Sequence, residues 1–451
     1  MGALFYVKWL SLVGSVCAIF SLLYLMSSQV DQSDDSIAYH HRHVNPKMKF
    51  LAKNEVSEKE AGQHGISMTT TSARNLENPS ALSIHIFYYP WYGSPKFDGG
   101  KYYHWNHPYL PNWDKSDQHN YPKGNHVPPP DIGSNFYPLL GPYSSRDPLV
   151  IEQHMKWISS AGVDVLVISW FPPGLADEQG HPWDDLIPSL MNVADKHRLK
   201  VTFHLEPYSG RNAVSIHRDI KYIIDTYGNH SAFYRLSREQ SQKDANVTKL
   251  PMLYVYDSYL IGDNEWRRLL ATDGDLSLRN TVYDIIIIGL IVKENDKYSL
   301  LKANFDGIYT YFASEGFTYG SSTSNWPAIS AFCRKNSLIF VPSAGPGYND
   351  LRIRPWNGGN VKGRDGGNYY AKQFESAHNS RAHILSITSF NEWHEGTQIE
   401  PAVAFHDNET DFVYIEYEKG PMQYLHATLD LIKKYFTPLH IIGPEQIQAV
   451  V

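Results

Sequence analysis

Short apolar runs alternate with amphipathic stretches along the chain after residue 81. Eight of these runs have the length and the apolar content of buried strands. They cover residues 83–89, 163–169, 201–206, 252–257, 284–292, 307–312, 338–342 and 384–390. Because polar, helix-like segments separate most of them, the pattern predicts alternating strands and helices around a buried parallel sheet.

Several of the intervening segments carry explicit helix signals. Asp147 followed by Pro148 is typical of a helix start, and Ile151, Met155 and Ile158 then recur at helical spacing. Similar apolar spacing occurs at residues 216–224 and 425–436. Eight strand–helix alternations predict an α/β fold, a (β/α)8 barrel of the TIM type with long loops on its C-terminal face. An open doubly wound sheet is the alternative, and the fifth run, which Gly289 interrupts, also fits a buried helix.

The N-terminal region differs in character from this alternating pattern. Residues 9–26 carry no charge, about the minimum length for a membrane-spanning helix, and no small-residue cleavage site follows them. Lys8 precedes this run, and acidic residues from Asp31 onward follow it, which places the N-terminus in the cytosol. We therefore expect a cytosolic tail (1–8), a transmembrane signal anchor (9–26), a flexible lumenal stem (27–80), a catalytic domain (81–440) and a C-terminal tail (441–451). A cleaved signal peptide is the alternative.

Composition narrows the possible partners. With 40 Lys and Arg against 47 Asp and Glu, the formal net charge is -7, so the chain has no general attraction for a nucleic acid. The two cysteines, Cys17 and Cys333, give no disulfide framework. Three glycosylation sequons, at Asn229, Asn246 and Asn408, fit a chain that enters the secretory pathway.

Polar and aromatic residues gather just past the ends of the predicted strands, where barrel enzymes build their sites. Aromatic faces beside carboxylates suit a carbohydrate groove. Two long loops have similar compositions: about 57 residues follow the first strand, and more than about 20 follow the seventh, including Arg352, Arg354, Trp356 and Asn357. We expect the substrate-binding residues to be Tyr89, Trp91, His104, Trp170, His204, Glu206, Tyr208, Asp257, Tyr309, Tyr311, Asn391 and Trp393.

Two glutamates past the eighth strand are the candidate catalytic residues. If the chain turns helically there, the Cβ atoms of Glu392 and Glu395 lie about 5–6 Å apart. Like charges at that distance raise one pKa, which supplies a proton donor and a proton acceptor near neutral pH, as glycoside hydrolysis requires. Glu206 is a further candidate acid. A solvated surface turn containing two glutamates is the alternative. Signatures of zinc hydrolysis, acyl transfer and nucleotide binding do not occur in the sequence.

The sequence resembles glycoside hydrolase family 99, the glycoprotein endo-α-1,2-mannosidases, over residues 84–436. Six long motifs carry this resemblance. They are FYYPWYGSPKFDGGKYYHWNHP (87–108), FYPLLGPYSSRDP (136–148), VTFHLEPYS (201–209), DGIYTYFA (306–313), SAGPGY (343–348) and SITSFNEWHEGTQIE (386–400).

The resemblance implies an endo-acting, retaining hydrolase that cuts an internal α-1,2-mannosidic bond in glucosylated high-mannose N-glycans and releases glucosyl-mannose. It implies that Glu392 acts as general base on the substrate's own 2-hydroxyl, producing a 1,2-anhydro sugar. Glu395 then acts as general acid and afterwards as base toward water. The resemblance implies no metal and no cofactor, and it implies a single-pass type II protein of the Golgi membrane with a lumenal catalytic domain.

Glu206 matches the active members of the family, whereas a related mannosidase-like branch has glutamine at this position. The chain therefore resembles the active members. Two positions depart from the family pattern: Phe171 stands where animal enzymes usually have tyrosine, and Pro90 replaces a serine. Phe171 bears on the preference for glucose or mannose beyond the cleavage point. Two other hypotheses stay open, a non-catalytic lumenal mannose-binding lectin and a conventional double-displacement glycosidase in which Glu206 partners Glu392.

Overall fold

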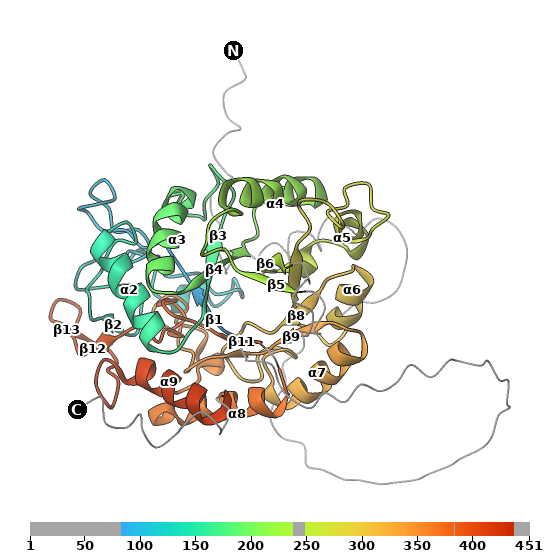
Figure 1. Ribbon diagram of the computed structural model, residues 1–451. Coiled ribbons are helices and arrows are strands. Elements are labelled where there is room, and N and C mark those ends of the chain that lie inside the picture. The colour runs from blue at the N-terminus through green and yellow to red at the C-terminus, as the bar shows by residue number, and fades with distance from the viewer. Residues whose placement is uncertain (1–82, 238–248, 383, 437–451) are drawn as a thin grey trace, which may run out of the picture. The chain divides into compact units, whose positions relative to one another are not determined.

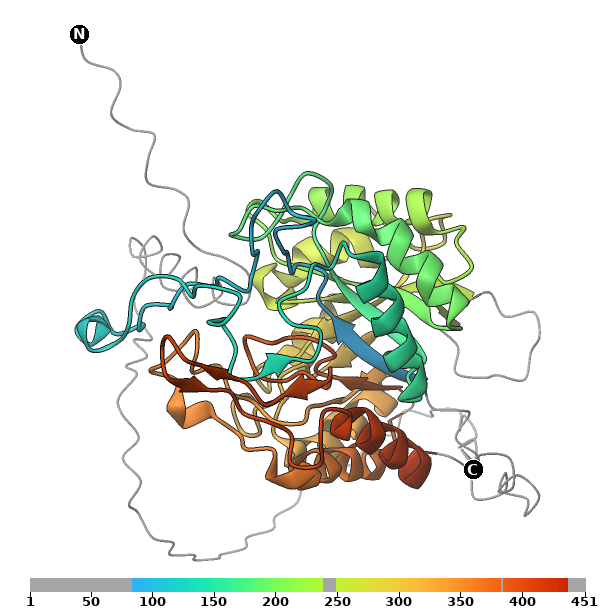
Figure 2. The same cartoon turned by 90° about the vertical axis from the view of Figure 1, so that its left-hand side faces the viewer.

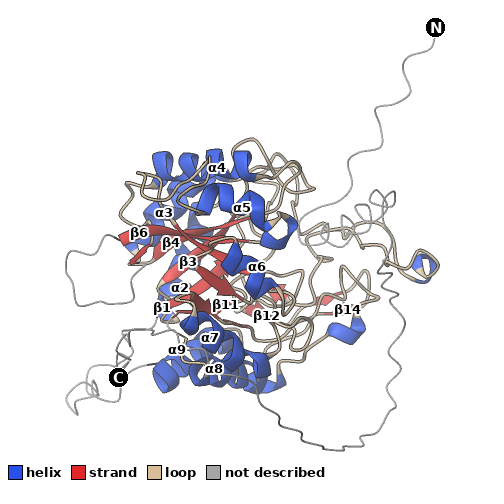
Figure 3. Cartoon of the chain, turned by 90° about the vertical axis from the view of Figure 1, so that its right-hand side faces the viewer, coloured by secondary structure: helices blue, strands red, loops and turns tan. Residues whose placement is uncertain are grey.

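A computed structural model of the chain describes residues 83–237, 249–382 and 384–436. Helices surround a ring of strands in these residues (Figures 1 and 3). The strands of the main sheet are β1 (Ser83–Tyr88), β3 (Val165–Trp170), β4 (Lys200–Leu205), β6 (Lys249–Val255), β7 (Ile286–Leu290), β8 (Gly307–Tyr309), β9 (Ile339–Val341), β10 (Ser343–Ala344) and β11 (Ile384–Ile387), with β5 (Arg235–Ser237) antiparallel to β6. Each of the eight predicted runs contains a strand.

The strand order shows how the barrel closes. The strands follow one another as β10-β11-β1-β3-β4-β6-β7-β8-β9, and every neighbouring pair on this path is parallel. Only Pro342 separates β9, which pairs with β8, from β10, which pairs with β11. The segment 339–344 therefore joins the two ends of the sheet. This nearly closed parallel barrel is consistent with the predicted (β/α)8 fold and excludes the open doubly wound sheet.

The helices lie outside the strands. They are α2 (Pro148–Ser160), α3 (Ile187–Lys196), α4 (Ala213–Tyr227), α5 (Asp263–Leu270), α6 (Asp296–Lys302), α7 (Trp326–Lys335), α8 (Asn368–Asn379) and α9 (Gln423–Phe436). Short 3-10 helices are η1 (Gln118–Asn120), η2 (Asp184–Leu186), η3 (Ser258–Leu260), η4 (Thr323–Asn325), η5 (Gly358–Asn360) and η6 (Asp365–Gly367). The Asp147 carboxylate accepts a hydrogen bond from the N–H of Leu149, which confirms the predicted start of α2.

The fifth apolar run is a strand, so the buried-helix alternative is wrong. All five residues of β7 are buried. A Cβ atom at Gly289 would lie 2.3 Å from Cδ2 of Leu300 on α6 and 2.9 Å from Cδ1 of Phe305. The glycine that interrupts the run thus permits the close approach of α6 to the sheet.

The two long loops lie at the C-terminal end of the barrel strands. The first contains β2 (Tyr137–Pro138), which pairs with β12 (Ala402–Val403) beyond the eighth barrel strand, and β13 (His406–Asp407) pairs with β14 (Phe412–Val413) nearby in sequence. The part of the first loop around η1 projects away from the barrel (Figure 2). Within the described residues, no helix combines the length and the apolar character needed to cross a bilayer. The span predicted at residues 9–26 lies outside these residues.

Candidate active site

The two predicted catalytic glutamates occupy a tight turn directly after β11. The N–H of Gly396 donates to the carbonyl of Trp393 (3.2 Å), and the chain forms a hydrogen-bonded turn there and not a helix. Gly396 has a φ of +62°, and a Cβ atom on it would lie 2.7 Å from the Asn349 carbonyl oxygen. The glycine after the second glutamate therefore lets this turn pack against the loop that follows β10.

Glu392 is buried at the mouth of the barrel, with 1% of its surface exposed. Its N–H donates to Ser389 Oγ (2.8 Å), and its Oε1 accepts from the N–H of His394 (3.1 Å). Burial, followed by the neighbouring charge of Glu395, raises the pKa of the Glu392 carboxyl well above its usual value. Glu392 is therefore a stronger base than a solvated carboxylate whenever it is ionised.

Glu395 is buried beside the guanidinium of Arg354. Nη1 of Arg354 lies 3.9 Å from Glu395 Oε1 and donates to Asp350 Oδ2 at 2.8 Å. Burial raises the pKa of Glu395 to about 7; the charge of Arg354 opposes this rise, and that of Asp350 adds to it. A carboxyl with this pKa exchanges its proton near neutral pH, which suits a general acid that later serves as a base.

Glu392 and Glu395 act on each other electrostatically. Because both are buried in one turn, neither ionises as readily as a free carboxyl. A carboxyl pair that keeps one of its two protons near neutral pH has one donor and one acceptor. This arrangement rules out the solvated surface turn that the sequence left open.

Tyr89 and Asn391 connect the first and last of the eight predicted strand runs. The Asn391 amide accepts from the N–H of Tyr89 (2.8 Å) and donates to its carbonyl (2.9 Å). The Tyr89 hydroxyl bonds that of Tyr311, and the charge of Glu392 contributes to raising the pKa of Tyr89, after burial. Asn391 thus uses both polar atoms of its amide to hold Tyr89, and through it Tyr311, beside Glu392.

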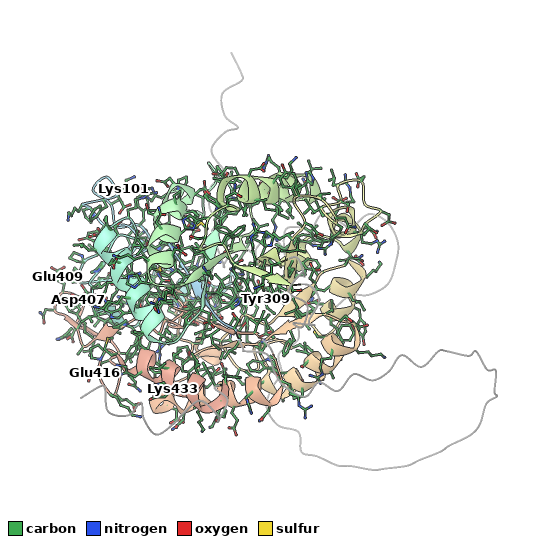
Figure 4. The ribbon with its side chains drawn as sticks, viewed as in Figure 1. Lys101, Tyr309, Asp407, Glu409, Glu416 and Lys433 are labelled. Carbon is green, nitrogen blue, oxygen red and sulfur yellow. The ribbon has the colours of Figure 1, made fainter. Side chains whose placement is uncertain are left out.

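A second acidic cluster lies at the ends of β4 and β6. Tyr309 lies near the centre of the ring of strands (Figure 4). Its hydroxyl donates to the Val255 carbonyl (3.1 Å). Because the hydroxyl proton is used in that bond, the hydroxyl oxygen accepts from Nε2 of His204 (2.7 Å). Nδ1 of His204 lies 3.3 Å from Glu206 Oε1. Burial raises the pKa of Asp257 to about 7, and the charge of Glu206 adds to this rise. Glu206 also raises the pKa of Glu392, so the two acidic groups belong to one site.

Trp91 and His104 supply a stacked aromatic surface. Their rings are nearly parallel (7°), with centroids 4.6 Å apart, and the ring of His394 lies 6.1 Å from that of Trp91. His104 Nε2 lies 2.7 Å from Asp177 Oδ2, and the backbone carbonyl of His104 bonds His394 Nε2 (2.9 Å). These contacts attach the first long loop to the turn that carries Glu392 and Glu395 (residues 392–396, the catalytic turn).

Three predicted binding residues have their polar groups directed elsewhere. Trp170 donates to Asp184 (2.7 Å) and packs between Phe203 and Tyr222, on the helix side of the sheet. The hydroxyl of Tyr208 bonds Ser215 and Asp219 of α4. Trp393 is fully buried and donates to Glu400 (3.0 Å). These contacts give each residue a role in packing; substrate binding by the three residues stays a prediction.

Glu400 is a buried carboxylate that was not predicted from the sequence, and it bonds Trp393, which lies between the two glutamates. Glu400 is fully buried and accepts from Trp393 Nε1, from the Tyr143 hydroxyl (2.8 Å) and from His154 Nε2 (3.1 Å). Its position within the motif SITSFNEWHEGTQIE was an available signal. Asp350 and Arg354 were also detectable, as an acid–base pair four residues apart.

Comparison with known proteins agrees with this geometry. Residues 80–437 match glycosyl hydrolase family 99. The glycoprotein endo-α-1,2-mannosidase of Rattus norvegicus is 51% identical over 80% of this chain and 77% of its own length, and a Danio rerio glycoprotein endo-α-1,2-mannosidase-like protein is 51% identical over 81% of each. The solved GH99 endo-α-mannosidase of Bacteroides thetaiotaomicron is 40% identical and superposes with a TM-score of 0.70, covering 78% of this chain and 97% of that one.

The family match and the named relatives show the class of this protein, a glycoside hydrolase. Its candidate site has two buried carboxyl groups whose pKa values are raised, beside aromatic rings at the mouth of the barrel. The chain belongs to glycosyl hydrolase family 99.

Proposed function

We propose that this chain is an endo-acting, retaining α-1,2-mannosidase that cuts an internal bond in glucosylated high-mannose N-glycans and releases glucosyl-mannose. The names of the relatives support this bond and this sugar. The observation that carries the proposal is the pair of buried glutamates in one turn, each with a raised pKa. The alternative, a non-catalytic lectin, does not require two carboxyls with raised pKa values, because it transfers no proton.

In the first step, Glu392 takes the proton of the mannose 2-hydroxyl, and the freed oxygen attacks C1 from the face opposite the leaving group. The C1–O bond to the rest of the glycan breaks, and Glu395 donates its proton to the departing oxygen. The product of this step is a 1,2-anhydro sugar. In the second step, water attacks C1 and gives a proton to Glu395, while the ring-opened O2 recovers its proton from Glu392. Two inversions at C1 give net retention.

The surroundings of the two glutamates favour this division of roles. A sugar hydroxyl is a weak acid, so its base benefits from the raised pKa of Glu392. Glu395 stands beside Arg354, whose charge stabilises the carboxylate that forms after proton donation. A double displacement through Glu392 would not need the 2-hydroxyl, so a 2-deoxy substrate separates the two mechanisms.

We also propose that residues 9–26 anchor the chain in the Golgi membrane as a single-pass type II protein, with residues 81–440 in the lumen. The support is the uncharged run itself, with Lys8 before it and acidic residues after it. The lumenal side is where N-glycans of secretory proteins are exposed to a processing enzyme.

The test incubates the purified chain with a glucosylated high-mannose N-glycan and measures the masses of the fragments. Release of a glucose-mannose disaccharide supports the proposal. Release of glucose alone assigns a different bond, and binding without turnover favours the lectin. A matched reaction with Glu392→Gln shows whether any release depends on the catalytic turn.

A further inference from the structure

Arg364 bonds the backbone of the catalytic turn and has no part in the steps proposed above. Nη2 of Arg364 donates to the carbonyl of Gly396 (2.9 Å) and to the carbonyl of Gln398 (2.8 Å). Gly396 directly follows Glu395, the proposed acid. Nε and Nη1 of Arg364 are buried and have no hydrogen-bond partner in the described part of the chain. Within these residues, the hydrogen bonds of this guanidinium therefore all go to the catalytic turn and the two residues after it.

Three aromatic rings contact the guanidinium of Arg364. Its central carbon lies 4.5 Å from the ring centroid of Phe136, 4.9 Å from that of Tyr417 and 4.5 Å from that of Tyr424. Phe136 belongs to the first long loop and Tyr424 to α9, so segments far apart in the sequence meet at this side chain. A guanidinium is planar and stacks on such faces, whereas the ammonium of lysine is a compact point charge. Lysine at this position would therefore keep the charge and lose the geometry.

The loop after β10 carries Arg364 and makes a further contact with the catalytic turn. Within this loop, the N–H of Tyr348 donates to the carbonyl of Lys362 (3.0 Å), and the N–H of Lys362 donates to the carbonyl of Tyr348 (2.8 Å). The next residue, Asn349, donates its N–H to the carbonyl of Glu395 (2.7 Å). Because Lys362 is two residues from Arg364, the loop holds the acid's own carbonyl through its backbone and the next carbonyl through Arg364.

The hydrogen bonding of Arg364 differs from that of an arginine that serves stability. Buried N–H groups without partners cost stability, and Arg364 has such groups on two of its nitrogens. Arg279, by contrast, donates from all three of its nitrogens to backbone carbonyls, those of Leu270 (2.9 Å), Ile285 (2.7 Å) and Asn304 (2.8 Å). The contacts that Arg364 does make are therefore better explained by the placement of the catalytic turn than by stability.

We propose that Arg364 is a positioning residue: it fixes the carbonyls of Gly396 and Gln398 and thereby keeps Glu395 in the orientation from which it protonates the departing oxygen. The inference rests on the proposed function, because it takes Glu395 as the acid. A misplacement of about 1 Å costs a reaction about a hundredfold in rate. A side chain that acts only through the backbone of the turn therefore controls kcat.

The kinetic test compares wild type with Arg364→Ala and Arg364→Lys, and Arg279→Lys is the matched control. Arg279 also bonds backbone carbonyls, but Ile285 directly precedes β7, at the N-terminal end of the barrel strands and away from the site. On a glucosylated N-glycan, we expect Arg364→Ala to lower kcat about tenfold or more and to change KM by less than about twofold. Arg364→Lys has an intermediate kcat, and Arg279→Lys keeps the wild-type kcat. Equal losses of kcat in the two lysine variants overturn the inference.

The leaving group shows whether Arg364 acts through Glu395. A strongly acidic phenol departs from an α-mannoside without protonation, so the loss of kcat in Arg364→Ala should fall to about twofold or less on such a substrate. A loss as large as that on the glycan overturns the positioning of the acid, because the substitution then damages the whole site.

Backbone hydrogen exchange separates this inference from the proposed function, because it needs no turnover. Residues 392–398 should exchange about tenfold faster in Arg364→Ala than in wild type, and no faster in Arg279→Lys. If Arg364→Ala does not fold, Arg364→Lys serves for the same comparison. Wild-type exchange in these residues overturns the inference even if the enzyme is active. A wild type that does not cleave the glycan overturns the proposed function, and the exchange rates then still decide whether Arg364 holds the turn.

Discussion

Asn391 holds the backbone of Tyr89 at both polar atoms of its side-chain amide, accepting from the N–H at 2.8 Å and donating to the carbonyl at 2.9 Å. The two residues are 302 positions apart, at the ends of the first and last predicted strand runs. These two hydrogen bonds fix Tyr89 beside Glu392, the residue that follows Asn391 in the sequence. Precise placement of the catalytic turn therefore depends on an amide that need not touch the substrate.

Replacing Asn391 with aspartate keeps the size of the side chain but removes the donor to the Tyr89 carbonyl. It also places a negative charge next to Glu392. We expect a loss of about 1–3 kcal/mol of transition-state stabilisation, seen mainly in kcat. Asn379→Asp, at the exposed end of α8, is the control. An unchanged kcat for Asn391→Asp contradicts the positioning role.

The pH profile of kcat/KM tests the electrostatic control of Glu395. Its alkaline limb reports loss of the proton from the acid, and burial places that pKa at about 7. Arg354 favours the carboxylate, so Arg354→Gln raises the pKa and moves this limb to higher pH, by about one unit. Asp350 acts in the opposite sense, so Asp350→Asn moves the limb to lower pH.

Circular dichroism at each pH checks that both variants are folded, because breaking a buried ion pair is costly. If the alkaline limbs of Arg354→Gln and Asp350→Asn move in the same direction, the shifts come from a general loss of packing and not from the charges of these two residues.

The raised pKa of Glu395 also predicts that the active site costs stability. The free group ionises near 4.5 and the buried group near 7, so the unfolded chain loses its proton first, and the free energy of unfolding falls between these pH values. Glu395→Gln removes this cost. We expect the variant to be more stable than wild type by about 3 kcal/mol at pH 8, with little difference at pH 4. Denaturant titration at the two pH values measures this; equal stability at pH 8 contradicts it.

The lumenal orientation predicts glycosylation of this chain itself. Asn408 lies in the turn between β13 and β14, and Asn229 follows α4; both are exposed, whereas Asn246 lies outside the described residues. In a secretory cell, removal of N-glycans should increase the gel mobility of wild type, and by a smaller step that of Asn408→Gln. A chain without any such modification at Asn229, Asn246 or Asn408 argues against the proposed orientation.

The apolar runs located eight of the nine strands on the barrel path of the described residues, because a strand buried on both faces is a continuous apolar segment. The exception is the two-residue β10, which follows β9 after Pro342 and is too short to form such a run. The glutamate pair could be singled out from the sequence, because its two members stand three apart in one motif, and the structure buries both; their catalytic roles stay a prediction. Side-chain direction past a strand end was not predictable: Trp170 and Trp393 look alike in the sequence to Trp91, yet their indole N–H groups bond Asp184 and Glu400.

Contacts between distant segments explain the features that were missed. Glu400 meets His154 across 246 positions, and no local pattern announces such a pair. The projecting loop is similar, because the contact between Trp113 and Trp356 depends on how two irregular segments pack. Regular periodicity predicts the scaffold, whereas irregular loops determine much of the site.

The measurement that tests the division of roles most directly is the activity of Glu392→Gln and Glu395→Gln on two α-mannosides, one with a sugar leaving group and one with a strongly acidic phenol. A phenolate departs without protonation, so Glu395→Gln should recover at least about a hundredfold on the second substrate relative to the first. Glu392→Gln, which cannot activate the 2-hydroxyl, should stay inactive on both. Recovery by Glu392→Gln instead, or by neither variant, would contradict the assignment of Glu392 as base and Glu395 as acid.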